Sequence, residues 1–523
     1  MNKGIRLLIA LSLLLILIQA LSWAYALPSV ASVTRALLDY LVTETFVQDA
    51  IVTSTRWLLG WLIGLTLGVI AGFSTGRNPF FETLFEGFFT LLRAVPFICM
   101  VPLSVRIFGF DEAGKWFTVA WAVFFVTWVS VHTSAKAIEN SHVARARSLR
   151  LTRGAWIRHG IFSLIGPSML GTARTSLLIG LVVTAIAELA GAYDRSSGYF
   201  WSEGLGYRMF RALNQGDDSM LMASIVCFSL LGVTGDRILL EVVIRYQYLS
   251  ERIRKSNSKR NAREARSTYA ASQVVPPIKP PSLTVRDLTV AFERTPVFKD
   301  LSFSINAGET MAVIARSGAG KSSLIQAISK NLRPGSLPKG EVTFEDAHMQ
   351  PTHPHIGLVF QSANVYQNLT VWNNALIGRT DSGARATAQE AIELIDKFGL
   401  DGAISQQSGT LSGGQIQRLA LLSTLLTNPP VIMFDEPLGA LDAITKRELQ
   451  EFFVQKFRRE SRATCLWVTH SAEEALVVAD KIMIGLGAER KIIDNPSSLD
   501  RGWQSSMGFL ELRDEILDHL RDA

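Results

Sequence analysis

The residues whose spacing most directly suggests chemistry form a glycine-rich loop with a lysine and a serine at its end. Residues 315–322 read Ala-Arg-Ser-Gly-Ala-Gly-Lys-Ser, after an apolar stretch at 310–314 and before a helical pattern at about 322–332. A phosphate-binding loop requires this strand, loop and helix order. Backbone N–H groups at a helix N-terminus attract phosphate oxygens, the Lys321 ammonium would neutralise them, and the Ser322 hydroxyl would ligate Mg²⁺. The expected phosphate-binding residues are Ser317, Gly318, Ala319, Gly320, Lys321, Ser322 and Ser323.

The first position of this loop holds Ala315 where the pattern has glycine. Alanine is unfavourable there only if the backbone needs a positive φ, which glycine adopts at no cost. We expect the loop to function, because the phosphate contacts begin at Ser317.

A pair of carboxylates forms the second half of the expected site. Residues 431–436 read Val-Ile-Met-Phe-Asp-Glu, which is typical of a buried strand that ends in two acids. Asp435 can hold Mg²⁺, and Glu436 can polarise a water molecule. This pair disfavours the alternative that the glycine-rich loop is only a tight turn.

The run Leu411-Ser-Gly-Gly-Gln415 indicates a family. Residues 410–418 resemble the signature of ATP-binding-cassette (ABC) ATPases, and the resemblance extends over about 284–495. It implies ATP and Mg²⁺ as cofactors. It also implies a catalytic set of Glu436, His470, Gln361 and Lys321, metal ligands Ser322, Gln361 and Asp435, and Phe292 as a residue that stacks on adenine. Ordinary packing is the alternative for Phe292.

The signature also implies a second copy of the same chain. In the family, two cassettes pair head to tail, and each ATP lies between the phosphate loop of one and the signature of the other. Donors near a helix N-terminus would face the γ-phosphate. One copy cannot close a site, so we expect a homodimer in which Ser412, Gly413, Gly414 and Gln415 complete the partner's nucleotide site.

Composition predicts that another part of the chain lies in a membrane. Hydrophobic residues make up 48% of the 523 residues and charged residues only 19%, which excludes a disordered chain and an ordinary soluble enzyme. Six stretches are apolar enough to span a bilayer: 7–34, 57–76, 84–107, 116–135, 175–193 and 219–235. The first could instead be a cleaved signal peptide ending near Ala24-Tyr25-Ala26, but its apolar run is longer than a signal core.

Loop charge predicts the orientation. Residues 136–158 carry six Lys or Arg and one Glu, whereas residues 28–50 carry only Arg35 as a basic residue. The basic loop is therefore expected to be cytoplasmic, with the ATPase on the same side of the bacterial inner membrane. This bias also explains the net charge of +6 without a nucleic-acid partner. The three cysteines are far apart and predict neither disulfides nor a cysteine metal site.

The expected domains are a transmembrane permease at 1–250, a basic and proline-rich linker at 251–282, an ABC ATP-binding domain at 283–500 and a tail at 501–523. The linker passes from many arginines and lysines to two Pro-Pro pairs, so we expect a tether that stiffens toward polyproline. Its basic run could bind membrane lipids or RNA, although topology alone also accounts for it.

The membrane half resembles the permeases of the nitrate, sulfonate and taurine (and bicarbonate) branch of bacterial importers. The resemblance rests on residues 92–103, 108–109, 187–188 and 204–207. It implies a helical type I importer-like domain fused to an α/β P-loop ATPase. It also implies a docking loop at about 144–158, with Gly154 and Ala155 at its packed turn. We expect the arginines of this loop to be exposed and to fix its orientation, because exposed ion pairs contribute only about 0–1 kcal/mol. The alternative is a solvated basic loop that topology alone places there. The family's opening glutamate is missing there, and the spacing before Gly154 is stretched.

Together these features favour a fused importer that takes a small, anionic solute from a periplasmic binding protein. The alternatives are an exporter half-transporter, for which the loop at 76–86 is too short, and a membrane-anchored regulatory ATPase. Arg93, Arg174 and Glu188 lie in or near the spans and are candidates for the translocation path. They could equally pair with one another inside the helix bundle. The sequence does not identify the solute.

Overall fold

The computed structural model describes Gln19 and residues 28–522, apart from residues 110, 139, 192–203, 268–278, 293–294, 317, 333–335, 347, 383–387, 460–462, 488–489 and 496–506. The chain forms two compact units. The first comprises residues up to Ile138 and Leu164–Leu249, and the second comprises Glu139–Ser163 and Ser250–Ala523.

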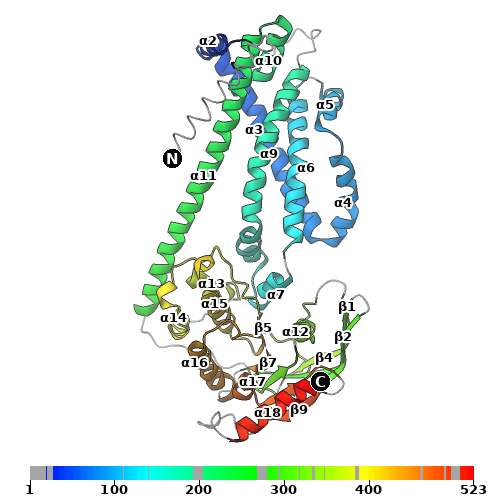
Figure 1. The fold of residues 1–523 in the computed structure, drawn as a ribbon, viewed down its shortest axis with the longest axis vertical. Coiled ribbons are helices and arrows are strands. Elements are labelled where there is room, and N and C mark those ends of the chain that lie inside the picture. The colour runs from blue at the N-terminus through cyan, green and yellow to red at the C-terminus, as the bar shows by residue number, and fades with distance from the viewer. Residues whose placement is uncertain are drawn as a thin grey trace. The chain divides into compact units, whose positions relative to one another are not determined.

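The first unit is helical (Figure 1). Its elements are α2 (Val30–Leu41), α3 (Glu44–Arg77), α4 (Pro79–Arg93), η1 (Phe97–Cys99), α5 (Met100–Phe108), α6 (Glu112–Lys136), α9 (Phe162–Gly191), α10 (Gly204–Gln215) and the first part of α11 (Asp218–Ser267). Within the described residues, four helices are long and apolar enough to cross a membrane, and the pair α4 and η1–α5, bent by 87°, can form a fifth. Five of the six predicted spans fall on these helices. Of the first, residues 30–34 belong to α2, and the part before residue 28 lies outside the described residues apart from Gln19.

Helix α3 packs closely against α6 because it carries a glycine on every fourth residue. A Cβ atom at Gly60, Gly64, Gly68, Gly72 or Gly76 would lie only 2.5–2.8 Å from the nearest atom of α6. Such small-residue stripes let membrane helices approach at backbone distance, where dispersion forces are strongest. The opposite face of α3 exposes leucine and isoleucine side chains, as a lipid-facing surface requires.

The second unit contains two sheets. One is antiparallel, in the order β2 (Thr295–Ile305), β1 (Ser282–Phe292), β4 (Ser336–Glu345). The other has the order β5 (Ile356–Val359), β6 (Val431–Asp435), β7 (Thr464–Thr469), β3 (Thr310–Ile314), β8 (Lys481–Ile484), β9 (Lys491–Asp494). Its strands are parallel except for the β8–β9 pair. The strands predicted at 310–314 and 431–435 are confirmed.

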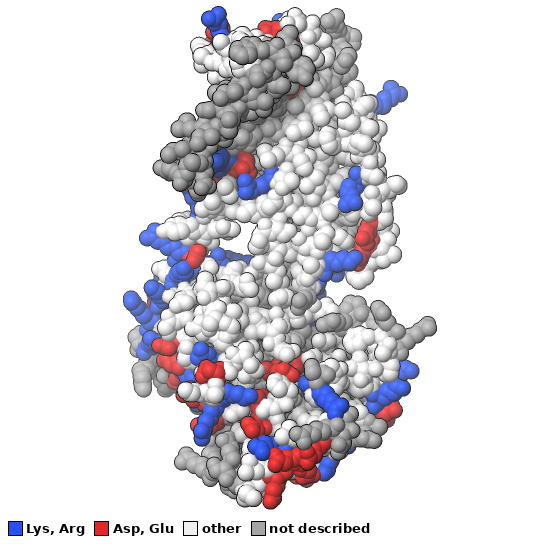
Figure 2. Space-filling view, viewed as in Figure 1, with Lys and Arg blue, Asp and Glu red and all other residues white. Residues whose placement is uncertain are grey.

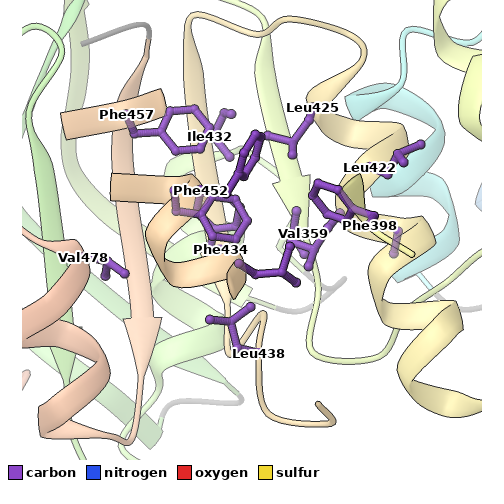
Figure 3. Close-up of a cluster of buried hydrophobic side chains, with 14 of the residues drawn as sticks. Val359, Phe398, Leu422, Leu425, Ile432, Phe434, Leu438, Phe452, Phe457 and Val478 are labelled. Carbon is purple, nitrogen blue, oxygen red and sulfur yellow. The ribbon is translucent and has the colours of Figure 1, made fainter. Parts of the chain in front are cut away.

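Further helices of this unit are α12 (Lys321–Ile328), α13 (Val371–Ser382), α14 (Ala388–Lys397), α15 (Gly413–Leu425), α16 (Ala443–Phe453), α17 (Ala472–Val478) and α18 (Met507–Asp522), with the 3₁₀ turns η3 (Asp401–Ala403) and η4 (Ser408–Thr410) and the π-helical segment η5 (Val454–Arg459). Helices α12, α15, α17 and α18 contact strands of the larger sheet. The core cluster in Figure 3 fills the space between β6 and the helices of this unit with Phe398, Phe434 and Phe452. On the face drawn in Figure 2, charged side chains gather on this unit, whereas the described residues of the first unit are mostly uncharged.

The expected linker is wrong in its first half, because α11 continues as a helix to Ser267. Two i,i+4 ion pairs, Glu251–Lys255 and Arg260–Glu264, support this extension. Ala262 and Ala265 are buried in the core of the second unit, so packing also holds the segment helical. The first predicted Pro-Pro pair lies outside the described residues.

Candidate functional site

The phosphate loop joins the fully buried strand β3 to helix α12, as the sequence predicts. Gly318 and Gly320 have φ of 85° and 95°, where other residues are strained. A Cβ atom at Gly320 would also collide with Val297 of β2. Ala315 is not among the described residues with positive φ, so alanine causes no strain at this position. Ser317 lies outside the described residues.

A buried carboxylate lies beside this loop. Asp435 ends β6, and burial raises its pKa, although a hydrogen bond donated by Ser322 opposes the shift. A desolvated carboxylate with a hydroxyl at hand is a donor set that Mg²⁺ accepts, because a hard cation prefers oxygen ligands and offsets the buried charge. The residues present therefore fit the expected metal.

Three further side chains converge on Glu436. Its Oε2 accepts a hydrogen bond from Gln361 Nε2 at 3.2 Å and lies 3.3 Å from His470 Nδ1, and its Oε1 lies 3.6 Å from Lys321 Nζ. Glu436 itself has φ of 46°, a left-handed conformation that is uncommon outside glycine. Its N–H donates to Val468 O at 2.9 Å, so β7 holds the strained residue in place. The side chains of Gln361, His470 and Lys321, from three separate segments, thus meet at the Glu436 carboxylate.

Phe292 is the last residue of β1, paired with Thr295 and Ser336, and it packs half-buried against the core of the antiparallel sheet. Its expected role in stacking on adenine stays a prediction.

The signature residues begin helix α15 with a capping box. Gln415 N donates to Ser412 Oγ at 3.4 Å, and Ser412 N donates to Gln415 Oε1 at 3.0 Å. Ser412 and Gly413 are exposed, and Gly414 lies beside Ala440. Among the described residues, no hydrogen bond or ion pair joins the signature to the phosphate loop of the same chain.

The loop between the membrane helices forms α7 (Asn140–Ser148), α8 (Arg153–Ala155) and η2 (Trp156–Ile161), and it belongs to the second unit. Arg145 is only 1% exposed, and its Nη2 donates to Ser423 Oγ of α15 at 2.7 Å. Ser148 Oγ accepts a hydrogen bond from Leu358 N of β5 at 2.7 Å. Residues 144–149, the docking segment, are therefore buried in the ATPase apart from the exposed Arg147.

An apolar cluster completes this contact. Leu149 is fully buried with Tyr366, Leu369 and Ile377. A Cβ atom at Gly378 of α13 would lie 2.9 Å from Leu149 O, so the docking segment crosses α13 at a position that admits only glycine.

The expected packed turn at Gly154 and Ala155 is wrong. Nothing lies within 4 Å of a Cβ atom at Gly154, which is exposed in the first turn of α8, where Thr152 Oγ1 caps Ala155 N at 3.3 Å. The chain docks before this turn, at the end of α7. The expectation that the loop arginines are solvated is also wrong for Arg145, although Arg150 and Arg153 are exposed.

Docking should weaken in acid because of His355. Its Nε2 lies 2.5 Å from Ser148 O, where a neutral ring can donate, and burial lowers its pKa from 6.5 to about 4. Between pH 6.5 and pH 4, His355 binds more protons when the docking segment is released than when it is docked. Acidification therefore favours release of the segment. From pH 7.5 to pH 5 the loss is at most about 2 kcal/mol, or roughly 30-fold in the protection factors of the amides of residues 144–151, measured by hydrogen exchange.

His355→Gln should remove most of this pH dependence, because its amide can still donate but does not titrate. His353→Gln, at an exposed position two residues away, is the matched control and should behave as wild type. An unchanged pH profile in His355→Gln would refute the assignment.

The three candidate residues of the translocation path are not brought together. Glu188 is buried and pairs with Arg56 at 3.0 Å, and it also accepts hydrogen bonds from Thr53 and Gly206. Arg174 pairs with Asp236 at 2.7 Å. Arg93 is exposed and forms no ion pair within the described part of the chain.

The sequence did not lead us to expect Arg56 as the partner of Glu188, or Asp236 as the partner of Arg174. The available signal was their position, because each is a charged residue at the border of an apolar stretch.

Comparisons with known proteins agree with this architecture. The family model "ABC transporter" matches residues 298–439, and "Binding-protein-dependent transport system inner membrane component" matches residues 64–245. An aliphatic sulfonates import ATP-binding protein of Shouchella clausii is 33% identical over 242 residues, which are 46% of this chain and 91% of that protein. A sulfate/thiosulfate import ATP-binding protein of Mesorhizobium japonicum is 35% identical, over 41% of this chain and 65% of its own. A solved dimeric bacterial ABC transporter cassette matches 41% of this chain and 99% of its own, with 24% identity and a TM-score of 0.35.

Proposed function

Because the chain belongs to the ABC transporter family, with a binding-protein-dependent permease domain fused to its ATPase, we propose that it imports a small anionic solute across the bacterial inner membrane. ATP hydrolysis powers this import. The strongest support for coupling is the docking segment, since Arg145 and Leu149 come from the loop between membrane helices and are buried in the ATPase. A regulatory ATPase that moves no solute would not need this burial.

In the proposed mechanism, the backbone at Gly318–Ser323 and the Lys321 ammonium hold the phosphates of ATP. Ser322, Asp435 and Gln361 would hold Mg²⁺, which when bound neutralises phosphate charge. The Glu436 carboxylate accepts a proton from the attacking water. His470 and Gln361, both within 3.3 Å of Glu436, orient that carboxylate and reach the γ-phosphate region.

Two copies of the chain would form two such sites. A test is to mix subunits carrying Lys321→Ala with subunits carrying Ser412→Arg. In a heterodimer, one site loses both Lys321 and Ser412, and the other keeps both. We therefore expect mixed dimers to regain up to about half of the wild-type ATPase activity, while each variant alone is nearly inactive. Dimers isolated with two different tags in nanodiscs provide the measurement. No recovery in mixed dimers, or a stable ATP-hydrolysing monomer, would contradict the two-chain site.

The names of the relatives support a sulfonate or sulfate-like oxyanion as the solute, delivered by a periplasmic binding protein. Thermal-shift screening of that binding protein with sulfonates, sulfate, nitrate and bicarbonate would identify the ligand. Uptake of the labelled ligand into proteoliposomes, with ATP inside and binding protein outside, then tests the function. Uptake that needs no binding protein, or export, would contradict an importer. Hydrolysis without any movement of solute would favour the regulatory ATPase.

A further inference from the structure

Two glutamates and a histidine that the nucleotide site does not use converge in the membrane unit. Glu82 and Glu86 lie one turn apart on α4, and His132 lies on α6. One ligand atom from each side chain can be chosen so that all three lie within 4.8 Å of one another. Donors at about 2.0–2.2 Å from a tetrahedral ion lie roughly 3.3–3.6 Å apart, so small side-chain rotations would bring these three atoms to the spacing that one ion requires.

The imidazole of His132 is held in a defined orientation. His132 is only 8% exposed, and its Nδ1 lies 3.0 Å from Thr75 Oγ1. Thr75 Oγ1 accepts a hydrogen bond from Trp128 Nε1 at 3.0 Å, and its hydroxyl can donate to Ala71 O at 2.9 Å. With the hydroxyl proton placed toward Ala71 O, Thr75 Oγ1 accepts from His132 Nδ1, and Nε2 is the nitrogen without a proton. A histidine that ligates a metal is typically fixed in this way by its other ring nitrogen.

The second ring nitrogen then directs a lone pair toward carboxylates. No hydrogen bond reaches His132 Nε2 from the described residues, and its nearest charged neighbour is Glu86 Oε1 at 3.9 Å. A lone pair that faces a carboxylate is repelled unless a cation lies between them. Lys136 forms its close ion pair with Glu82 and attracts Glu86 only from a longer distance, so within the described residues no Lys or Arg forms an ion pair with Glu86.

We propose that Glu82, Glu86 and His132 bind a divalent transition-metal ion. One imidazole and two carboxylates suit Zn²⁺ or Mn²⁺, with solvent in the remaining coordination position. The side chain of Glu86 is 45% exposed, so an ion can reach the site from outside the helices. The ion would hold the first two turns of α4 against α6. Helix α4 is the first member of the bent helix pair. The site does not depend on which solute is transported.

The test uses the full-length chain in nanodiscs, with its purification tag removed, stripped with a chelator and kept free of nucleotide. Zn²⁺ or Mn²⁺ is added, excess is removed by desalting, and the metal retained per chain is measured by mass spectrometry. We expect one ion per chain and a higher thermal unfolding midpoint with metal, because binding to the folded state alone stabilises it. His132→Gln and Glu86→Gln should each weaken binding at least about 10-fold, and Thr75→Val, which removes the orienting oxygen, should weaken it by about 10-fold or more.

His353→Gln, which removes an exposed histidine of the other unit, is the matched control and should bind metal as wild type does. If His132→Gln does not fold, Glu86→Gln decides, because its partly exposed side chain should tolerate the change. Three results would overturn the site: less than about a tenth of an ion per wild-type chain, binding by His132→Gln and Glu86→Gln that equals the wild type, or an equal loss of binding in the His353→Gln control.

Discussion

Replacing Glu436 by glutamine is expected to lower ATP turnover by about 10²- to 10⁴-fold while ATP still binds. The amide has nearly the same shape as the carboxylate but cannot accept the proton of the attacking water. Phosphate binding should survive, because Lys321 and the backbone of the loop are unchanged. Steady-state phosphate release and ATP affinity, measured on the same nanodisc sample, separate the two effects. Closed dimers should accumulate with ATP bound, because each ATP would lie between two chains and would no longer be removed by hydrolysis.

A matched control is Glu448→Gln, which changes an exposed carboxylate on α16 in the same way. It should hydrolyse ATP at the wild-type rate. Because Glu436 has a positive φ, Glu436→Gln could also act through the backbone, so Glu436→Asp is informative. A shorter carboxylate should keep more activity than the amide if proton transfer is the role. Wild-type turnover in Glu436→Gln would remove Glu436 from the chemistry.

The nucleotide site was largely predictable because its parts are local patterns. A strand, a glycine-rich turn and a helix follow one another between residues 310 and 328, and the fold places them without help from distant segments. Gln361 and His470 could not be placed by spacing alone, since each lies on a different strand end. Their positions beside Glu436 followed from the family resemblance. The left-handed backbone of Glu436 has no sequence signal.

The docking segment was less predictable, because burial depends on a surface far away in the sequence. Arg145 looks like one more base in a cytoplasmic loop, and only Ser423, 278 residues later, gives it a buried partner. The sequence predicts a tether where α11 continues as a helix, because the surface that buries Ala262 and Ala265 is also distant in the sequence.

The glycine stripe of α3 is different, because its period of four residues is visible in the sequence. Such a stripe predicts a close contact between helices, which is absent from the expectations given above.

The docking segment leads to the second large effect, which is expected from Gly378→Val. A Cβ atom at this position would lie 2.7 Å from Thr427 Cγ2 and 2.9 Å from Leu149 O. The threonine can turn away, but the carbonyl oxygen belongs to the backbone and moves only if the docking segment moves. Overpacking of this kind costs about 1–3 kcal/mol. Docking should therefore weaken by roughly 5- to 150-fold, and uptake into proteoliposomes should fall while the isolated nucleotide site still hydrolyses ATP.

Gly378→Ala should act in the same direction with a smaller effect, and it carries its own internal check. Alanine favours a helix over glycine by roughly 1 kcal/mol, so α13 alone should become more stable. A variant that is more stable and yet poorly coupled would locate the defect at the docking segment and not in the fold of the ATPase. Gly402→Val, at an exposed position where a Cβ atom meets nothing within 4 Å, is the control for adding bulk to this unit. If Gly378→Val transports solute at the wild-type rate, with unchanged stimulation by the binding protein, residues 144–149 do not transmit the work of ATP.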